Sequence, residues 1–210
     1  MKHLISLLLV CLTTPVAAFD LKQKRSHIIF SDEIRPTHYT VNKYGLLTAK
    51  VRYSASALIY AFDRPRKISE VSFVWKPEGF IKTMSYKQET TKKGDDFYLR
   101  IGLILSGPKP FIPFFAPAWV KAIRGALKLP SDKMIYLTAG AWAKPGTIWP
   151  SPYTDSMTNI SVGSQDLKYN WRRSTYKPKK PLTVVGIWIM ADGDNTGSKF
   201  TTKLKSLTLK

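Results

Sequence analysis

Two short polar segments place carboxylates beside glycines, as loops do when they present side chains to a ligand or an ion. The first segment, 94–100, reads Gly-Asp-Asp-Phe-Tyr-Leu-Arg, and the second, 192–197, reads Asp-Gly-Asp-Asn-Thr-Gly. Binding and catalytic side chains are concentrated on such loops. We predict ligand binding by these segments, by an aromatic loop near residue 149 and by one later arginine. The candidate residues are Asp95, Asp96, Tyr98, Arg100, Trp149, Tyr153, Arg172, Asp192, Asp194, Asn195 and Thr196.

The segment 192–197 resembles half of a calcium loop, because hard cations bind oxygens that converge on a glycine turn. In a helix–loop–helix calcium site the twelfth position is a glutamate, and here it is Lys203. A sandwich-type site would need backbone carbonyls and a remote carboxylate, such as Asp95 or Asp96. An Asx-rich turn that satisfies its own backbone is the simpler interpretation. We therefore expect no metal or other cofactor, with Ca²⁺ at Asp192 and Asp194 as the alternative.

Alternation along a strand predicted over 95–105 would place Asp96, Tyr98 and Arg100 on one face. If that face is buried, its charges must be paired with each other or with neighbours such as Asp192, Asp194 or Arg172. If it lines a cleft, a carboxylate, a phenol and a guanidinium suit a groove for a sugar or an acid. Both interpretations stay open, and the buried network is favoured.

Hydrolysis of a glycan would need two carboxyl groups across the scissile bond. Asp95 or Asp96 together with Asp192 or Asp194 could supply them. A serine hydrolase is disfavoured, because the chain has no Gly-x-Ser-x-Gly motif. We expect a protein that binds rather than one that catalyses, with a glycan-active hydrolase as one alternative.

The stretch 106–131 combines an aromatic run between prolines with a helix predicted over 118–129, which Pro130 ends. Aromatic side chains beside a basic amphipathic helix suit a membrane interface or a partner groove. The alternative is a helix that packs on its own domain. The candidate membrane or partner residues are Phe111, Phe114, Phe115, Trp119, Lys121 and Arg124.

The elements that must position these residues are predominantly strands. The run 184–190 is almost wholly apolar and predicts a strand buried on both faces. About ten short strands separated by turn signals predict an all-β sandwich or jelly roll, with a helical insertion near 116–129. We expect one domain over 19–210, in which 106–131 is the insertion.

Residues 1–18 resemble a secretory signal, with Lys2, an apolar centre and a small-residue cleavage site. Cys11 is the only cysteine and lies inside that signal. We therefore expect an exported protein, periplasmic or secreted. The 33 basic against 14 acidic residues predict attraction to polyanions and to membrane surfaces, and to nucleic acid only non-specifically. The oligomeric state stays open.

Six stretches, in order, are similar to the bacterial domain-of-unknown-function family 3047, a set of exported β-rich proteins. The stretches are 54–57, 71–75, 94–100, 135–142, 146–153 and 191–197. The resemblance covers most of 39–209. It implies a sandwich like those of carbohydrate-binding modules and implies no established activity. It also pairs the segment 94–100 with the segment 192–197.

The sequence thus predicts an exported, non-catalytic binding protein of the bacterial envelope. The expected ligand is a glycan or another polyanion. A peripheral protein that uses Phe111–Leu129 on a membrane or partner is the second hypothesis, and the hydrolase is the third.

Overall fold

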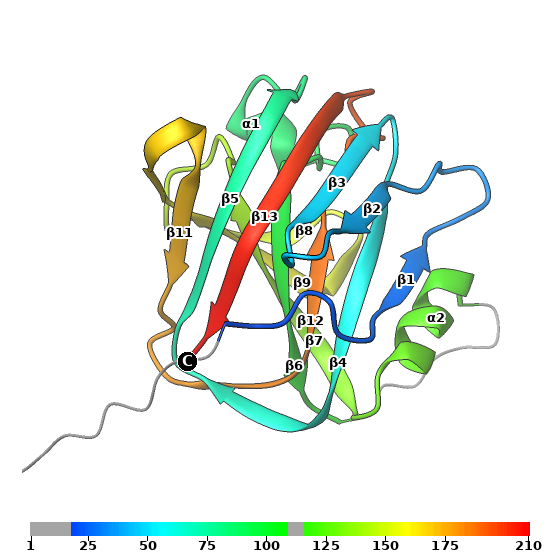
Figure 1. Cartoon of the computed structure of the whole chain (residues 1–210). Helices are drawn as coiled ribbons and strands as arrows, with labels where there is room; N and C mark the ends of the chain where they lie inside the picture. Colours follow the sequence, from blue (N-terminus) through cyan, green and yellow to red (C-terminus); the bar gives the residue numbers. More distant parts are fainter. Residues whose placement is uncertain (1–17, 109–115) are drawn as a thin grey trace, which may run out of the picture.

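Two β-sheets pack face to face in the computed structural model, which describes residues 18–108 and 116–210 (Figure 1). The seven-stranded sheet contains, in spatial order, β1 (Ser26–Ile29), β4 (Ser56–Ile68), β12 (Leu182–Met190), β6 (Leu99–Ser106), β7 (Ser131–Ala139), β9 (Thr154–Val162) and β8 (Ile148–Ser151). The six-stranded sheet contains β10 (Ser164–Asp166), β11 (Arg172–Tyr176), β5 (Val71–Phe80), β13 (Lys199–Leu209), β3 (Leu47–Arg52) and β2 (His38–Val41). The predicted sandwich is confirmed, with thirteen strands among the described residues rather than about ten.

The central strand β12 is buried on both faces, as its continuous apolar run predicts. Ile187 and Ile189 point into the core between the sheets. Trp188 and Met190 belong to a second apolar cluster on the outer face of the seven-stranded sheet. Alternate side chains of a strand point to opposite faces, so one strand serves both clusters.

Three strand boundaries differ from those that the sequence indicates. The sequence Asp-Arg-Pro-Arg at 63–66 is typical of a turn that ends a strand, but β4 runs through it. Pro65 lies at a bulge where the register jumps from Arg66 to Ala61, and a bulge needs no ladder donor there. The strand expected from Asp95 begins only at Leu99. The aromatic loop expected around Trp149 is partly the edge strand β8.

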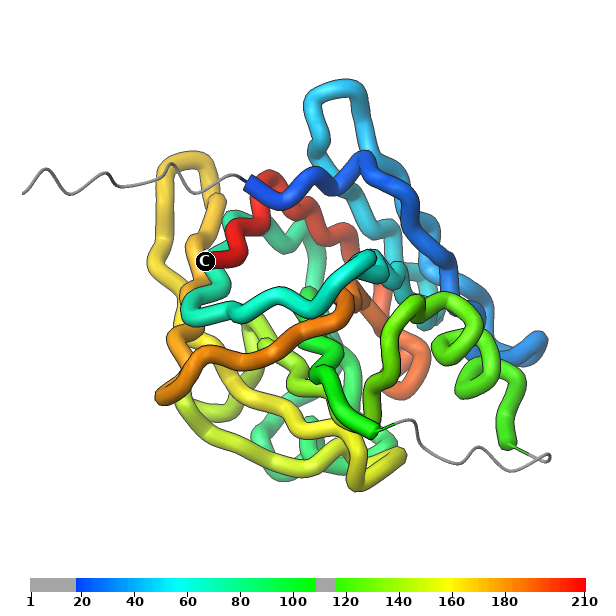
Figure 2. The backbone as a smooth tube through the Cα atoms, turned by 90° about the horizontal axis from the view of Figure 1, so that it is seen from below, coloured from blue at the N-terminus to red at the C-terminus, as the bar shows by residue number. Residues whose placement is uncertain are grey.

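Three helical elements connect the strands: α1 (Tyr86–Glu89), α2 (Ala118–Ala126) and the 3₁₀ turn η1 (Lys168–Asn170). The helix expected over 118–129 ends at Ala126. Seen from below, α2 lies outside the two sheets beside the N-terminal segment (Figure 2). Trp119 on α2 meets Phe30 edge to face at 6.2 Å, and Phe30 stacks on Trp188 at 6.1 Å. The helix therefore covers part of the outer face of the seven-stranded sheet.

Residues 1–17 of the signal predicted over 1–18, together with Phe111, Phe114 and Phe115, lie outside the described residues. Within the described ranges, no helix is long and apolar enough to cross a membrane.

Candidate functional site

Arg100 is the centre of the site and comes from an outward-facing position of β6. Its side chain is only 2% exposed. Nη1 donates to Asp95 Oδ2 at 3.0 Å, and Nη2 donates to Asp192 Oδ2 and to the backbone carbonyl of Asp95, each at 2.5 Å. The guanidinium lies 4.5 Å from the ring centroid of Phe97 and 5.4 Å from that of Tyr136. A buried charge requires such pairing, because an unpaired one would lose its hydration without compensation.

Asp96 does not pair with Arg100 but holds the loop 192–197 in place. Its Oδ1 accepts from the backbone N–H and the side-chain amide of Asn195, both at 3.2 Å. Its Oδ2 accepts from the backbone N–H and the hydroxyl of Thr196, both at 2.6 Å. The loop is further fixed at Gly193, where a Cβ atom would lie 2.8 Å from Val51 Cγ1. The segments 94–100 and 192–197 therefore face each other, as the resemblance to the family implies.

Burial dominates the protonation of these carboxyl groups. It raises the pKa of Asp192 well above its ordinary value, against the opposing effect of Arg100. Burial also raises the pKa of Asp95 and of Asp194, and for Asp194 the neighbouring Asp96 adds to the rise. Several carboxylates share one guanidinium, so the site disfavours further negative charge.

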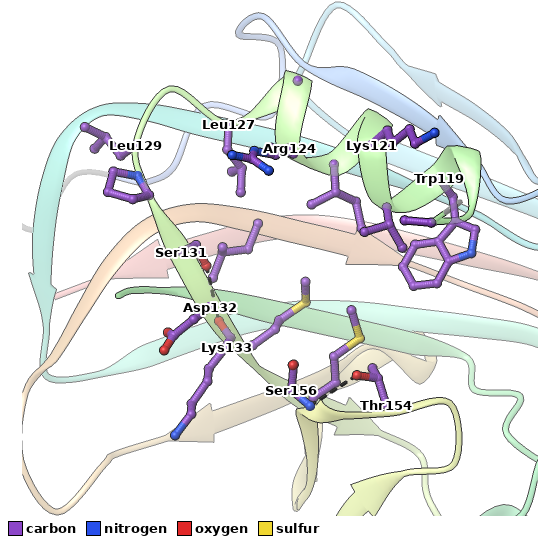
Figure 3. A pocket seen from close by; sticks show the side chains of 18 of the residues that line it. Trp119, Lys121, Arg124, Leu127, Leu129, Ser131, Asp132, Lys133, Thr154 and Ser156 are labelled. Carbon is purple, nitrogen blue, oxygen red and sulfur yellow. Dashed lines mark hydrogen bonds between the residues drawn. The ribbon is translucent and has the colours of Figure 1, made fainter. Parts of the chain in front are cut away.

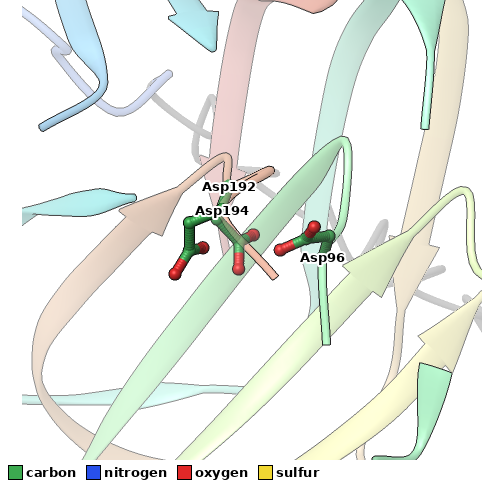
Figure 4. A group of neighbouring side chains, drawn as sticks. All are labelled: Asp96, Asp192 and Asp194. Atoms are coloured by element: carbon green, nitrogen blue, oxygen red, sulfur yellow. The ribbon is translucent and has the colours of Figure 1, made fainter. Parts of the chain in front are cut away.

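Asp96, Asp192 and Asp194 point toward one another, with one carboxylate oxygen of each within 4.8 Å of the others (Figure 4). Both oxygens of Asp96 already accept hydrogen bonds. The oxygens of Asp192 accept from Arg100 and from the backbone N–H of Phe97. A cation would have to displace these donors and tolerate the adjacent guanidinium. The donor set therefore fits an internal hydrogen-bond network better than a Ca²⁺ site.

A pocket of about 350 Å³ opens beside Arg100 on the outer face of the seven-stranded sheet. We call it the Arg100 pocket. Its charged lining is Asp95, Asp192, Asp194 and Arg100. Its aromatic lining, drawn from five separate segments, is Phe30, Trp119, Tyr136, Tyr153 and Trp188. An apolar wall with a few convergent polar groups is the usual composition of a small-ligand site.

Three buried polar atoms of this lining have no hydrogen-bond partner among the described residues. They are the donors Arg100 Nε and Trp188 Nε1 and the acceptor Asp95 Oδ1. Buried polar groups are normally paired, and each unpaired one is destabilising. All three atoms are almost inaccessible to solvent, so only a group that enters between the side chains would satisfy them.

The structure brings together most of the predicted binding residues. Tyr153 lines the pocket and donates through its hydroxyl to Asn195 Oδ1 at 2.7 Å, and burial raises its pKa to about 12. Thr196 supports Asp96 behind the pocket. Trp149 is buried and packs on Phe97.

Besides Trp149, which is not part of the pocket lining, two predicted binding residues lie elsewhere. Tyr98 packs against Trp75 and Phe200, in the direction of the six-stranded sheet. The single polar stripe of Asp96, Tyr98 and Arg100 is therefore not formed, because alternation cannot be extended to residues before the start of β6. Arg172 lies on β11 in the other sheet, 5.5 Å from the ring of Trp75.

The pocket also has walls that sequence reasoning did not assign to it. Trp188 and Tyr136 belong to apolar strands. The sequence alone does not distinguish aromatic residues that line a pocket from those that lie in the core. Phe30 directly follows β1, in a mainly polar and basic segment for which no binding residue was predicted. The strand order alone brings them beside Arg100.

The predicted membrane residues of α2 border a second hollow, of about 900 Å³, between the helix and the strands β7 and β9 (Figure 3). Trp119 and Met157 line both this hollow and the Arg100 pocket. Lys121 and Arg124 lie along α2 at its edge. Trp119 is thus engaged with Phe30 and with the pocket, which favours a helix packed on its own domain over one that inserts into a membrane.

Fold and site together define a β-sandwich that carries a partly aromatic, acidic pocket on the outer face of one sheet. The chain belongs to the family described as Protein of unknown function (DUF3047), whose model matches residues 24–208. A comparison with curated proteins found no match.

Proposed function

We propose that the protein is an exported, non-catalytic binding protein of the bacterial envelope, and that the Arg100 pocket binds one neutral sugar unit of a glycan. The observation that carries this proposal is an aromatic-walled pocket whose lining residues Arg100, Trp188 and Asp95 each keep one polar atom without a partner among the described residues. A hydroxyl group donates and accepts at once, so neighbouring hydroxyls of a sugar complement two donors and one acceptor.

The charge of the pocket supports a neutral ligand. Three carboxyl groups and one guanidinium line it, so an acidic sugar would add negative charge to a site with an excess of carboxyl groups. The side chains of Phe30 and Trp119 are partly exposed and offer apolar surface against which a sugar ring can pack. We therefore expect neutral sugars to bind more tightly than uronic acids.

Replacement of Trp119 by alanine tests the proposal, because it removes one wall without touching the ion pairs. Titration calorimetry with a panel of neutral and acidic mono- and disaccharides should show binding of a neutral member, weakened about tenfold in Trp119→Ala. The matched control is Trp142→Ala, since Trp142 is 60% exposed and lies outside the pocket lining. Failure of every neutral sugar to bind, or equal losses in both variants, would contradict the proposal.

A glycan-active hydrolase is the second candidate, favoured by Asp194. This carboxyl group lines the pocket, is only partly buried and has a raised pKa because of burial, as a general acid requires. The partner carboxylate is the weak point: Asp96 and Asp192 are both engaged by several donors. Polysaccharide turnover that disappears in Asp194→Asn while sugar binding persists would favour this candidate over a pure binding protein.

A further inference from the structure

The outer face of the six-stranded sheet gathers basic residues that are far apart in the sequence. Alternate residues of β3, β5 and β13, such as Val51, Trp75 and Phe200, point into the core, so the residues between them point outward. The strand register places these outward residues in rows across the sheet. Six of them are cationic, namely Lys50, Arg52, Lys76, Arg173, Lys199 and Lys203. We call this surface the cationic face.

Like charges lie directly opposite each other on the cationic face. Arg52 is the cross-strand partner of Lys199, and Lys76 is the partner of Lys203. Both lysines of the second pair share Glu78, at 3.7 and 2.7 Å. Directly opposed like charges destabilise a sheet. An anion bound across these rows would remove that repulsion.

One end of the cationic face is hollowed and rich in hydroxyl groups. A depression of about 500 Å³ is lined by the hydroxyl groups of Ser72, Thr175, Ser206 and Thr208, by Arg173, and by Glu70, which pairs with Lys177 and Lys210. Hydroxyls that neighbour cations suit a ligand that carries both hydroxyls and negative charge.

We infer that the cationic face binds an acidic polysaccharide. The outward positions of β3, β5, β11 and β13 carry apolar side chains only at Val74 and at Phe80, at one end of β5. A membrane surface would be bound with apolar residues that insert among the lipids. A nucleic acid single strand would be bound with aromatic rings that stack on bases. A cationic, hydroxyl-bearing sheet face fits an extended glycan with repeating carboxylates better than either.

This surface is distinct from the Arg100 pocket. It lies on the opposite sheet and favours an anionic rather than a neutral ligand. The inference therefore stands independently of the proposed function, and Trp119→Ala should leave binding of an acidic polysaccharide unchanged.

The test compares two variants with the same change in net charge. Lys50→Glu with Arg52→Glu alters the cationic face, and Lys144→Glu with Lys180→Glu alters exposed loop residues. Calorimetric titration with polygalacturonate oligomers should show binding at least about tenfold weaker in the first variant and less than about threefold weaker in the second. The dependence of affinity on NaCl should also become shallower in the first variant alone, because fewer counterions are exchanged.

Neutral dextran, single-stranded DNA and anionic phospholipid vesicles complete the comparison. Equal losses in the two variants, or tighter binding to DNA or vesicles than to polygalacturonate, would overturn the inference. The first variant should keep its melting temperature, because Arg52→Glu creates an opposite-charge pair with Lys199. Should it fail to fold, Lys50→Gln with Arg52→Gln must show a loss of at least about threefold for the inference to stand.

Discussion

Arg100 and its surrounding carboxylates show how strongly one side chain can depend on its neighbours. Its two terminal nitrogens are held by Asp95 and Asp192, and aromatic rings flank the guanidinium on two sides. Its Nε is buried without a partner among the described residues, and Arg100 belongs to the lining of the pocket. The same residue therefore holds Asp192 in the loop 192–197 and forms part of the pocket wall.

The raised pKa of Asp194 makes part of the stability depend on pH. A carboxyl group whose pKa is higher in the folded than in the unfolded state favours folding below its unfolded pKa and loses that contribution as pH rises through the folded value. Starting from the ordinary 3.8, wild type should therefore lose stability relative to Asp194→Asn as pH rises from about 4 to 7. Urea unfolding at several pH values measures the difference.

The exposed residue Asp155 provides the control for this comparison. Asp155→Asn should differ from wild type by a nearly constant amount over the same pH range. A wild type that gains stability relative to Asp194→Asn as pH rises would mean that Arg100, not burial, governs Asp194.

At the scale of elements, a single glutamate joins α1 to the loop between β7 and β8. Glu89 is buried, and its two oxygens accept from the backbone N–H groups of Trp142 and Ala143, both at 2.7 Å. Glu89→Ala would leave two N–H groups without acceptors, so we expect a loss of about 2–4 kcal/mol in the free energy of unfolding. Glu33→Ala, at an exposed position, should change it by less than about 0.5 kcal/mol. Equal effects would show that α1 is not held by this contact.

Some of these elements could be predicted from the sequence, and others could not. The strand 184–190 was predictable, because a short, uninterrupted apolar run rich in β-branched residues is typical of a strand buried on both faces. The need to neutralise a buried charge predicted a partner for Arg100, and Asp192 was one of several candidates for it. The pairing with Asp95 was not, because Asp95 precedes β6 and its direction does not follow from alternation. The pocket walls come from segments whose proximity depends on strand order, which local sequence does not encode.

At the scale of the whole molecule, charge is distributed unequally between the two sheets. The Arg100 pocket on the seven-stranded sheet is acidic, whereas the outer face of the six-stranded sheet is cationic. In the sequence the basic residues are scattered and indicate only a general attraction to polyanions. The register of β3, β5, β11 and β13 places basic residues from all four strands on one surface. Long-range strand pairing therefore determines where a polyanion can bind.

The formal net charge of +19 further predicts that salt stabilises the protein. Excess like charge opposes a compact state, and NaCl screens this repulsion. Salt also weakens favourable ion pairs, but the exposed pairs, such as Lys177 with Glu70 and Arg172 with Asp166, contribute little individually. Scanning calorimetry should therefore show a melting temperature that rises by about 2–4 °C between low and moderate NaCl. The rise should be smaller in Lys50→Glu with Arg52→Glu, where two repelling charges are reversed. A fall in melting temperature would mean that ion pairs, rather than net repulsion, dominate the electrostatics of the fold.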